Sequence, residues 1–417
     1  MTTMPLALLA NADWLGTLAA VRSLGARGVS VAVAGQRFLS IARWSRYASE
    51  SVYCPTLGKA EPFLEWLLSF GAEHPGSVLY PTSDEIAWLV ACHATELARY
   101  YKLYTPSLSS LLALLDKASL ASNAKRVGLD VPDTYAPCDK FKIDDIAHDI
   151  QYPVYIKPRA QIFGGLGKGI RADNCTELRA AWERRCSETA YDPTVLDQAP
   201  SIRLPMLQRC CPGERIYTVD GFVDETGEVS AMLACVKVLQ RPRGKGPGII
   251  FEHAPLDPEI EQGLLRLFRD TGFYGVFDAE FLEVDGKRLL IDLNPRFYNH
   301  MAFESDRGLD LPWLAYLAAT GNREALKGEI VKFRNSPISK NAYVHPLATR
   351  LLLAVQRLGG RMSSEQYARW KRQIRSYGEG ATNPVWTSDD PIPAFVECAS
   401  EMQGLRYPRS YFRDLLT

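Results

Sequence analysis

The sequence predicts an α/β protein built from several domains, and three patterns in the chain indicate this class. Strand and helix signals alternate through about the first hundred residues, which is typical of βαβ units and a doubly wound parallel sheet. Strand-like apolar runs then follow one another up to about residue 294, which is typical of an antiparallel sheet with helices beside it. From about residue 332 onward the pattern is helical.

Composition narrows the class of protein. The 417 residues are enough for two or three domains, and the 47% apolar fraction allows large cores. A formal net charge of zero argues against a generic nucleic-acid binder, which usually carries a basic patch. No apolar run approaches the ~18 residues of a membrane span, and the N-terminus lacks the basic segment of a signal peptide. Nine cysteines without a Cys-x-x-Cys pair fit reduced thiols. We therefore expect a cytoplasmic protein with small-molecule substrates and neither a nucleic-acid nor a membrane partner.

The first domain is predicted to contain four short parallel strands with helices between them. We expect the strands at residues 6–10, 29–33, 52–55 and 78–81, and helices at residues 14–24 and 63–70. The turn after Ala10 lacks Gly-x-Gly-x-x-Gly, so the dinucleotide-binding fingerprint is absent. An NAD-dependent oxidoreductase, which the βαβ pattern also suggests, is therefore disfavoured.

The middle of the chain is predicted to alternate helices and strands. We expect helices at residues 108–127 (interrupted at Asp116-Lys117), 176–185 and 257–271, and strands at 152–158, 204–211, 217–223 and 231–239. The strand at 217–223 is expected to continue antiparallel from the one before it. A glycine-rich loop at 164–169 follows Lys157, and glycine lets backbone N–H groups approach phosphate oxygens. It is not a P-loop, because Gly169 follows Lys168. A flexible hairpin tip is the alternative.

The most informative segment is a predicted hairpin at residues 276–296. Its turn is marked by Asp285-Gly286, which supplies the positive φ angles of a tight turn. Alternate strand residues share a face, so Asp292 and Asn294 point together and the hairpin brings Glu280 beside them. Two carboxylates and an amide oxygen form a hard oxygen site suited to Mg²⁺. A solvated hairpin with surface acids fits poorly, because both strands are otherwise apolar.

These motifs stand in the order and spacing of the ATP-grasp superfamily. The chain resembles its carboxylate–amine ligases, including the D-aspartate-ligase-like group, over roughly residues 5–330. The motifs that carry the resemblance are Asp116-Lys117, residues 154–158, the glycine-rich loop, Gln208 to Glu214, residues 279–281 and residues 292–296. It implies a Rossmann-like pre-ATP-grasp domain at 1–115, a small α+β lid at 116–200, a central antiparallel-sheet α+β catalytic subdomain at 201–330 and a helical C-terminal extension at 331–417.

The resemblance also implies site residues. ATP would be held by two lysines, a glycine flap and a strand end, namely Lys117, Lys157, Gly164, Gly165, Gly167, Gly169, Gln208, Arg209, Cys210, Cys211 and Glu214. One or two Mg²⁺ ions, with Mn²⁺ as a substitute, would be held by Glu280, Asp292 and Asn294. Arg296 would face the phosphoryl group or the substrate carboxylate. The family usually has Glu in place of Asp292.

One departure from the family concerns the substrate cation. Asp278 stands where relatives of the D-alanine ligase type carry arginine, so Lys237, Arg241 or Arg243 is expected to supply that charge; a solvated basic loop is the alternative. Further candidates are His253 and His300 as bases for the amine. Candidates for the acceptor site in the first domain are Arg46, Ser83, Asp84 and Glu85.

The activity that the resemblance implies is amide formation. A carboxylate would attack the γ-phosphate of ATP, giving an acylphosphate and ADP, and an amine would then displace phosphate. The expected substrates are amino acids or short peptides. ATP-dependent carboxylation or carbamoyl chemistry and a non-catalytic nucleotide-binding relative are the alternatives, and a homodimer is an open option.

Overall fold

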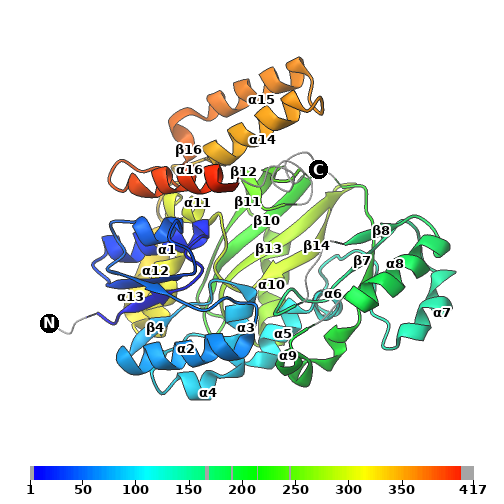
Figure 1. Ribbon diagram of the computed structural model, residues 1–417, viewed down its shortest axis with the longest axis horizontal. Helices are drawn as coiled ribbons and strands as arrows, with labels where there is room; N and C mark the ends of the chain where they lie inside the picture. The colour runs from blue at the N-terminus through cyan, green and yellow to red at the C-terminus, as the bar shows by residue number, and fades with distance from the viewer. Residues whose placement is uncertain (1–3, 165–168, 189–190, 214, 244–245, 405–417) are drawn as a thin grey trace.

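The computed structural model describes residues 4–164, 169–188, 191–213, 215–243 and 246–404. Three β-sheets follow one another along the chain, with helices packed around each of them (Figure 1). The predicted α/β class is confirmed. Across the described ranges, the helices all fall short of the length and apolar character that a membrane crossing requires.

The N-terminal part is a five-stranded parallel sheet in the order β3-β2-β1-β4-β5. Its strands are β1 (Ala7–Leu9), β2 (Val31–Gly35), β3 (Glu50–Tyr53), β4 (Ser77–Leu79) and β5 (Tyr101–Lys102), and its helices are α1 (Leu15–Ala26), η1 (Ile41–Trp44), α2 (Ala60–Glu73), α3 (Asp84–Cys92) and α4 (Ala94–Leu97). The four predicted strands are present; β5 has two residues, too few to show a pattern. The strand order reverses between β1 and β4, and ligands bind at such switch points, beyond the carboxyl ends of the strands.

A four-stranded sheet in the order β6-β9-β7-β8 forms the lid. Its strands are β6 (Thr134–Tyr135), β7 (Val154–Lys157), β8 (Ile170–Ala172) and β9 (Met206–Arg209), and around them lie η2 (Lys140–Lys142), α7 (Ile143–Ala147), α8 (Cys175–Glu188), α9 (Pro193–Gln198) and η3 (Pro200–Arg203). The helices α5 (Leu108–Leu115) and α6 (Lys117–Arg126) precede it, and they are separated at Asp116 as predicted.

The third sheet has seven strands in the order β14-β13-β10-β11-β12-β15-β16. They are β10 (Arg215–Val223), β11 (Ser230–Gln240), β12 (Gly248–Ala254), β13 (Gly275–Val284), β14 (Lys287–Asn294), β15 (Ala342–Val344) and β16 (Ala381–Thr382). The expectation that β10 continues antiparallel from β9 is wrong, because β9 pairs with β6 and β7 whereas β10 pairs with β11 and β13. Pro212-Gly213 interrupts the chain between them, and proline cannot donate to a ladder.

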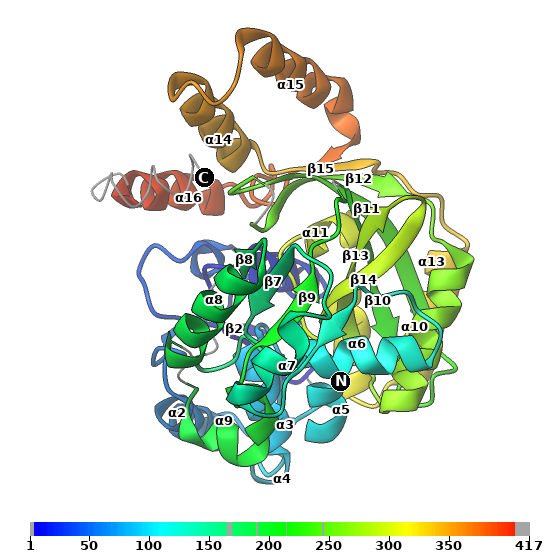
Figure 2. The ribbon, with the colours of Figure 1, turned by 90° about the vertical axis from the view of Figure 1, so that its right-hand side faces the viewer.

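From about residue 332 onward the chain is mainly helical, as predicted, and the segment between the hairpin and that point, for which no helix was predicted, is helical as well. The helices after the hairpin are α11 (Met301–Asp306), α12 (Leu311–Ala319), α13 (Arg323–Arg334), α14 (Pro346–Leu358), α15 (Ser364–Tyr377), η4 (Gly378–Gly380) and α16 (Ile392–Gly404). The strands β15 and β16 lie within this segment and extend the central sheet. Figure 2 shows α14 and α15 standing out beyond β12 and β15.

The two faces of the central sheet differ in character. One face buries apolar side chains such as Val219, Phe277 and Phe281 against α10 (Pro258–Thr271), whose Leu264 and Phe268 are buried in the same cluster. Alternate strand residues point the other way, and there the sheet carries its acids. The apolar face therefore anchors the sheet, and the polar face is left for a site.

Candidate functional site

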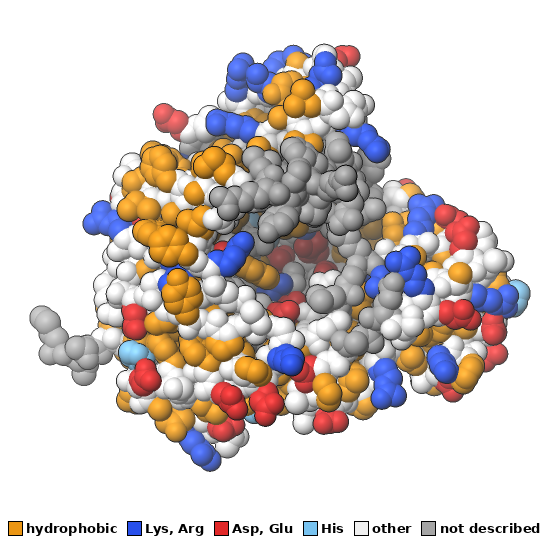
Figure 3. Space-filling model, viewed as in Figure 1, with side chains coloured by type: hydrophobic (Ala, Val, Ile, Leu, Met, Phe, Trp, Pro, Cys, Tyr) orange, Lys and Arg blue, Asp and Glu red, His pale blue; other side chains and the backbone are white. Residues whose placement is uncertain are grey.

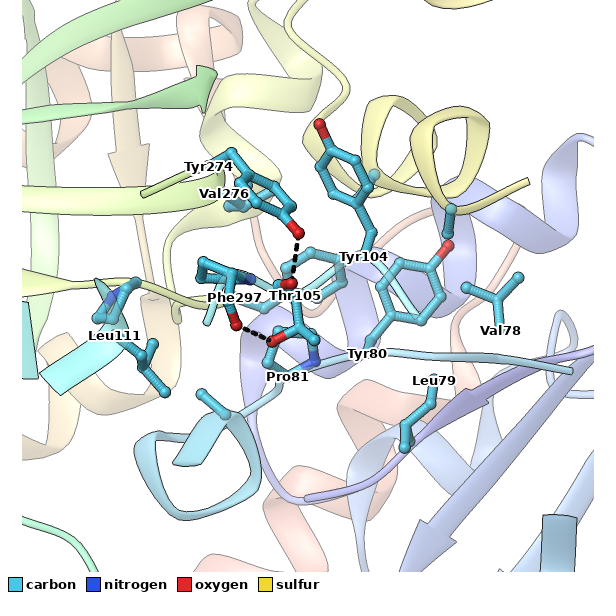
Figure 4. Close-up of a pocket in the computed structure, with 16 residues that line it drawn as sticks. Val78, Leu79, Tyr80, Pro81, Tyr104, Thr105, Leu111, Tyr274, Val276 and Phe297 are labelled. Atoms are coloured by element: carbon cyan, nitrogen blue, oxygen red, sulfur yellow. Dashed lines mark hydrogen bonds between the residues drawn. The ribbon is translucent and has the colours of Figure 1, made fainter. Parts of the chain in front are cut away.

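A cavity of about 1210 Å³ lies between the lid sheet and the central sheet, and Trp14, which precedes α1, lines it from the N-terminal domain. Figure 3 shows it as the hollow at the centre of this face, with acidic and basic side chains at its bottom. A smaller cavity of about 30 Å³ lies between β4 and α12, beside Tyr80, Tyr104 and Phe297 (Figure 4). That space holds about one water molecule, whereas the large cavity exceeds what a drug-sized ligand needs.

The floor of the large cavity is the predicted hairpin. Asp285 and Gly286 both have positive φ angles, 48° and 78°, as a tight turn requires. In the register of β13 and β14, Glu280 lies opposite Asp292, and Asp278 lies opposite Asn294. Directly paired residues share a face, and all four line the cavity. The structure therefore brings Glu280, Asp292 and Asn294 together and adds Asp278 to them.

The start of α6 places a lysine on this floor. The Asp116 carboxylate caps α6 by accepting from the backbone N–H of Ala118 (3.2 Å) and also accepts from Arg159 Nε (2.8 Å). The Arg159 carbonyl in turn accepts from the N–H of Lys117 (2.8 Å). So held, Lys117 forms an ion pair with Asp292. Burial would raise the pKa of Asp292, but the charge and hydrogen bond of Lys117 together with the charges of Lys157 and Arg296 outweigh it, and the pKa is lowered.

A second lysine neutralises the other floor acid. Lys237 of β11 is almost fully buried, with 5% of its side chain exposed, and its Nζ lies 2.6 Å from Glu280 Oε1. Burial opposes its charge, yet the pKa of Lys237 is raised because Glu280 and Asp278 attract the proton. Asp292 and Glu280 are thus each paired with a lysine, which carries the same sign of charge that a metal ion would supply.

A third lysine reaches the cavity from the lid. Lys157 ends β7, and its Nζ donates to Gln208 Oε1 at 2.8 Å, while the Gln208 amide nitrogen donates to Thr134 Oγ1 at 3.2 Å. Burial, and then the neighbouring charge of Lys117, lower the pKa of Lys157 to about 8. Gln208 therefore orients Lys157, a role that differs from the adenine contact expected of it. An anion between the two lysines would relieve their repulsion.

Arg296 links the floor to the N-terminal domain. Its Nε donates to Asp84 Oδ1 (2.8 Å), and its Nη2 donates to Asn294 Oδ1 (3.0 Å). Its guanidinium also lies over the ring of Trp14, 5.5 Å from the centroid. Trp14 follows β1 and Asp84 follows β4, so Arg296 sits at the switch point of the parallel sheet, where ligands of such folds bind.

The other predicted residues fall into three groups. Gly169, Arg209, Cys210, Cys211 and Arg243 line the cavity, whereas Gly165, Gly167 and Glu214 lie outside the described residues. Gly164 is described, with a φ of 118° that favours glycine. Arg241 points elsewhere: its guanidinium pairs with Glu401 of α16, with N–O distances of 2.9 and 3.2 Å. Of the three cations offered for the substrate, Lys237 and Arg243 therefore reach the cavity.

The candidates for bases and for the acceptor site also separate. His300 lines the cavity and lies 3.2 Å from Asp220, whereas His253 lies 3.2 Å from the buried Arg307. Asp84 reaches the site through Arg296, and Ser83 caps α3. Arg46 instead donates to the carbonyl of Asp389 (3.1 Å), which ties the first domain to the C-terminal segment.

Several cavity residues carried no recognisable sequence signal. Trp14, Arg171 and Asn299 line the cavity from three separate segments. The one available signal was position, since Trp14 follows a buried strand and Asn299 follows the hairpin. Asp278 was noticed as a departure from the family, and the structure shows its Oδ2 accepting from the Asn294 amide at 3.0 Å. Burial, and then the charge of Asp220, raise the pKa of Asp278 well above its usual range.

The donor set fits a magnesium–nucleotide complex. Among the described residues, seven cationic side chains line the cavity against three acidic ones. They are Lys117, Lys157, Arg171, Arg209, Lys237, Arg243 and Arg296 against Asp278, Glu280 and Asp292. Such an excess attracts a polyanion. The floor oxygens are the ligands that Mg²⁺ prefers. Ile216, Leu282 and Ile291 add apolar surface beside Cys210 and Cys211, which suits a flat base.

The comparisons with known proteins place the fold. No protein-family model matches the sequence, and no curated protein matches it. Among solved structures, the chain is similar to a biotin carboxylase–β,γ-ATP complex from Campylobacter jejuni, with 18% identity, a TM-score of 0.60, and coverage of 76% of this chain and 71% of that one.

Two further similarities agree with it. The biotin carboxylase domain dimer of Hydrogenobacter thermophilus 2-oxoglutarate carboxylase, solved with MgADP, ADP and bicarbonate, has 18% identity, a TM-score of 0.61, and coverage of 77% of this chain and 70% of that one. N5-carboxyaminoimidazole synthetase from Staphylococcus aureus has 12% identity, a TM-score of 0.56, and coverage of 76% and 77%. The chain therefore has the fold that these enzymes share, the ATP-grasp fold.

Proposed function

We propose that the chain is an ATP-dependent carboxylate–amine ligase that joins amino acids or short peptides through an acylphosphate. The observation that carries the proposal is the convergence, in one cavity, of a hard oxygen floor from the central sheet, lysines from α6 and the lid, and Arg296 at the switch point. The ATP-grasp fold supports it, and so do the neighbours named as complexes with ATP and MgADP.

The chain's own residues have distinct parts in binding. Lys117 and Lys157 would bind the phosphate oxygens, and Glu280, Asp292 and Asn294 would hold Mg²⁺, with Mn²⁺ as a substitute. When bound there, the metal ion neutralises charge on the transferred phosphoryl group. The ion would replace the lysines as partners of the two acids. Lys117 would then be free to turn from Asp292 towards the phosphates, so nucleotide and metal are expected to bind together.

The chemistry asks for positioning and charge neutralisation, which this site can supply. The substrate carboxylate would attack the γ-phosphorus, the bond to ADP would break, and Lys117 and Lys157 would stabilise the charge that moves to the leaving oxygen. Arg296 and Lys237 would orient the carboxylate. The amine would then attack the acyl carbon, the bond from that carbon to the phosphate oxygen would break, and phosphate would leave with the proton that the amine gives up. The lid strand β7 carries Lys157 and, with the loop after it, would exclude water.

The decisive experiment is a screen of amino-acid pairs. ADP and phosphate release would be measured with each pair, and the product would be identified by mass as the sum of the two substrates less one water. We expect release to need a carboxylate and an amine together and to be lost in Asp292→Asn, while Lys125→Ala, at the exposed end of α6, behaves as the unchanged protein. Release that is indifferent to both substrates, with no coupled product, would refute the proposal.

A carboxylation reaction is the second candidate, because one fold neighbour was solved with bicarbonate and another is a carboxyaminoimidazole synthetase. The same screen separates the two when bicarbonate replaces the organic carboxylate: ADP release that depends on bicarbonate and transfers its carbon to the amine would favour carboxylation. A cytoplasmic location fits the nine free cysteines. Whether the chain forms a homodimer stays a prediction.

A further inference from the structure

A second polar centre lies beside the cavity floor, on the same face of the central sheet. Four side chains share it: Asp220 of β10, Cys235 of β11, His300 and Glu304. All four are buried, with exposed fractions of 0%, 0%, 5% and 0%. His300 directly precedes α11 and Glu304 lies within it, so these two are four residues apart on one side of the helix start. The start of the helix and the sheet thus each offer two potential metal ligands.

The distances within this centre suit a tetrahedral ion. One potential ligand atom from each residue lies within 4.8 Å of those from the other three. His300 Nε2 is 3.2 Å from Asp220 Oδ2, and Cys235 Sγ is 3.6 Å from the same oxygen. Zinc bonds of 2.0–2.3 Å place tetrahedral ligand atoms roughly 3.3–3.8 Å apart. Both distances match that spacing closely.

Unpartnered oxygens supply an independent observation. Glu304 Oε2 is buried and has no hydrogen-bond partner among the described residues, and Asp220 Oδ1 is likewise buried, with the carboxyl of Asp278, its neighbour across the β10–β13 pair, as the one group that interacts with it. Leaving such oxygens unsatisfied away from water is costly, so buried polar atoms nearly always have a partner. The other oxygen of Glu304 accepts from Arg307 at 2.8 Å, an outer contact of the kind that orients metal ligands.

We propose that Asp220, Cys235, His300 and Glu304 bind one Zn²⁺ ion in a closed structural site. The charges balance: two carboxylates and a thiolate carry three negative charges, which the ion and the Arg307 guanidinium neutralise. The Cys235 proton leaves to solvent on binding. Sulfur, imidazole and carboxylate ligands together are typical of zinc, and four protein ligands leave no open position for a reactant.

This site is distinct from the magnesium site of the proposed ligase, since it shares no ligand with Glu280, Asp292 and Asn294. Its consequence is mechanical. The ion would join α11 to β10 and β11, and α11 begins five residues after Arg296. It would therefore fix the segment that carries Arg296 and Asn299 at the edge of the cavity.

Metal content tests the proposal on the full-length protein. Purified protein, desalted into metal-free buffer, is expected to retain about one zinc per chain by elemental analysis. After removal of zinc with a strong chelator, Co²⁺ should restore one metal per chain and produce the charge-transfer absorption of a cobalt–thiolate bond. Cys235→Ser should lose that absorption and Glu304→Gln should retain less metal, whereas Cys92→Ser and Asp292→Asn should match the unchanged protein.

Two outcomes would overturn the site. One is protein that neither retains zinc nor gives the cobalt–thiolate absorption, which would make the four residues a hydrogen-bonded cluster of protonated acids. The other is metal that is lost in Asp292→Asn but kept in Cys235→Ser, which would assign the ion to the cavity floor. If Cys235→Ser does not fold, the cobalt spectrum of the unchanged protein, compared with that of Cys92→Ser, still decides.

Discussion

Two acidic centres lie on the same face of the central sheet, and they are built differently. On the cavity floor, Asp292 and Glu280 are paired with Lys117 and Lys237, whose single positive charges sit on flexible stems. In the second centre, Glu304 pairs with Arg307, and both side chains are fully buried. The floor opens to a cavity of about 1210 Å³, whereas the residues of the second centre are buried and only His300 reaches the cavity wall.

This difference indicates which of the two centres can release its partners and bind a ligand in their place. A lysine that can turn away lets an acid trade one cation for another, as a site for metal and nucleotide must at each turnover. Arg307 cannot leave in the same way, because its Nη1 also donates to the carbonyl of Ala234 at 2.8 Å. We therefore expect changes on the floor to alter ligand binding, and changes in the second centre to alter stability.

The largest expected effect is on stability, from Arg307→Met. Removing one partner of a buried pair leaves Glu304 uncompensated, which lowers the free energy of unfolding by about 3–5 kcal/mol. Urea unfolding would measure it, with Arg323→Met as the matched control, because the Arg323–Glu225 pair is exposed and exposed pairs contribute about 0–1 kcal/mol. If Arg307→Met and Arg323→Met both lowered the free energy of unfolding by about 1 kcal/mol or less, the buried pair in the second centre would not stabilise the fold.

The next effect is on nucleotide affinity, from Lys157→Ala. Truncating a buried charge that a ligand needs weakens binding by roughly 10²-fold, which calorimetry with ATP and Mg²⁺ would measure. Without nucleotide, Lys157→Ala should not lower the free energy of unfolding as Arg307→Met does. The reason is that Lys157 lies near the like charge of Lys117 and donates to the neutral Gln208. Lys125→Ala is the control. If Lys157→Ala bound ATP as tightly as the unchanged protein, Lys157 would not be a phosphate-binding residue.

A smaller and graded effect is expected from pH. Burial and Lys117 lower the pKa of Lys157 from 10.5 to about 8, so the free protein loses this proton above about pH 8 while bound phosphates favour keeping it. Binding must then take up a proton, and the Kd for ATP should rise about tenfold per pH unit above that point. Calorimetry in buffers of different ionisation enthalpy would detect the proton. Lys157→Arg should abolish the uptake, because arginine stays charged.

The lowered pKa of Lys157 also makes the stability of the fold depend on pH. A lysine whose folded pKa is depressed destabilises the fold while it is charged, fully so below about pH 8. Between about pH 8 and 10.5 the unfolded chain binds more protons than the folded one, so this group's penalty declines as pH rises. The free energy of unfolding would be measured against pH, without nucleotide, for the unchanged protein and for Lys157→Arg. If the two proteins showed the same pH dependence between about pH 8 and 10.5, Lys157 would not carry the lowered pKa.

Local signals predicted the floor, because its geometry is local. Asp285-Gly286 fixes the turn, and strand alternation then carries Glu280 to Asp292. The second centre has no such signal. Cys235 and His300 are far apart in the sequence, and β11 and α11 bring them together only after the chain has folded. The family resemblance named Lys117 and Lys157, yet it did not show that Gln208 would orient Lys157.

Arg241 was expected to face the substrate but pairs with Glu401, and the local strand geometry explains the difference. Strand alternation, continued from Lys237, turns Arg241 to the cavity face. The register of β11 against β12 shifts between Lys237 and Leu239 and again between Leu239 and Gln240. A bulge changes the direction of the residues that follow, and Arg241 pairs with Glu401. No sequence pattern marked those shifts.

The smallest expected effect follows from that contrast. Lys237→Met removes the partner of Glu280 and should abolish most ATP turnover, whereas Arg241→Met should change turnover only a few-fold and lower the free energy of unfolding by about 1 kcal/mol, the scale of one partly exposed ion pair. Steady-state phosphate release and urea unfolding of both variants measure the two effects. If Arg241→Met reduced turnover as strongly as Lys237→Met, Arg241 would leave Glu401 during the reaction, and α16 would then control access of the substrate to the cavity.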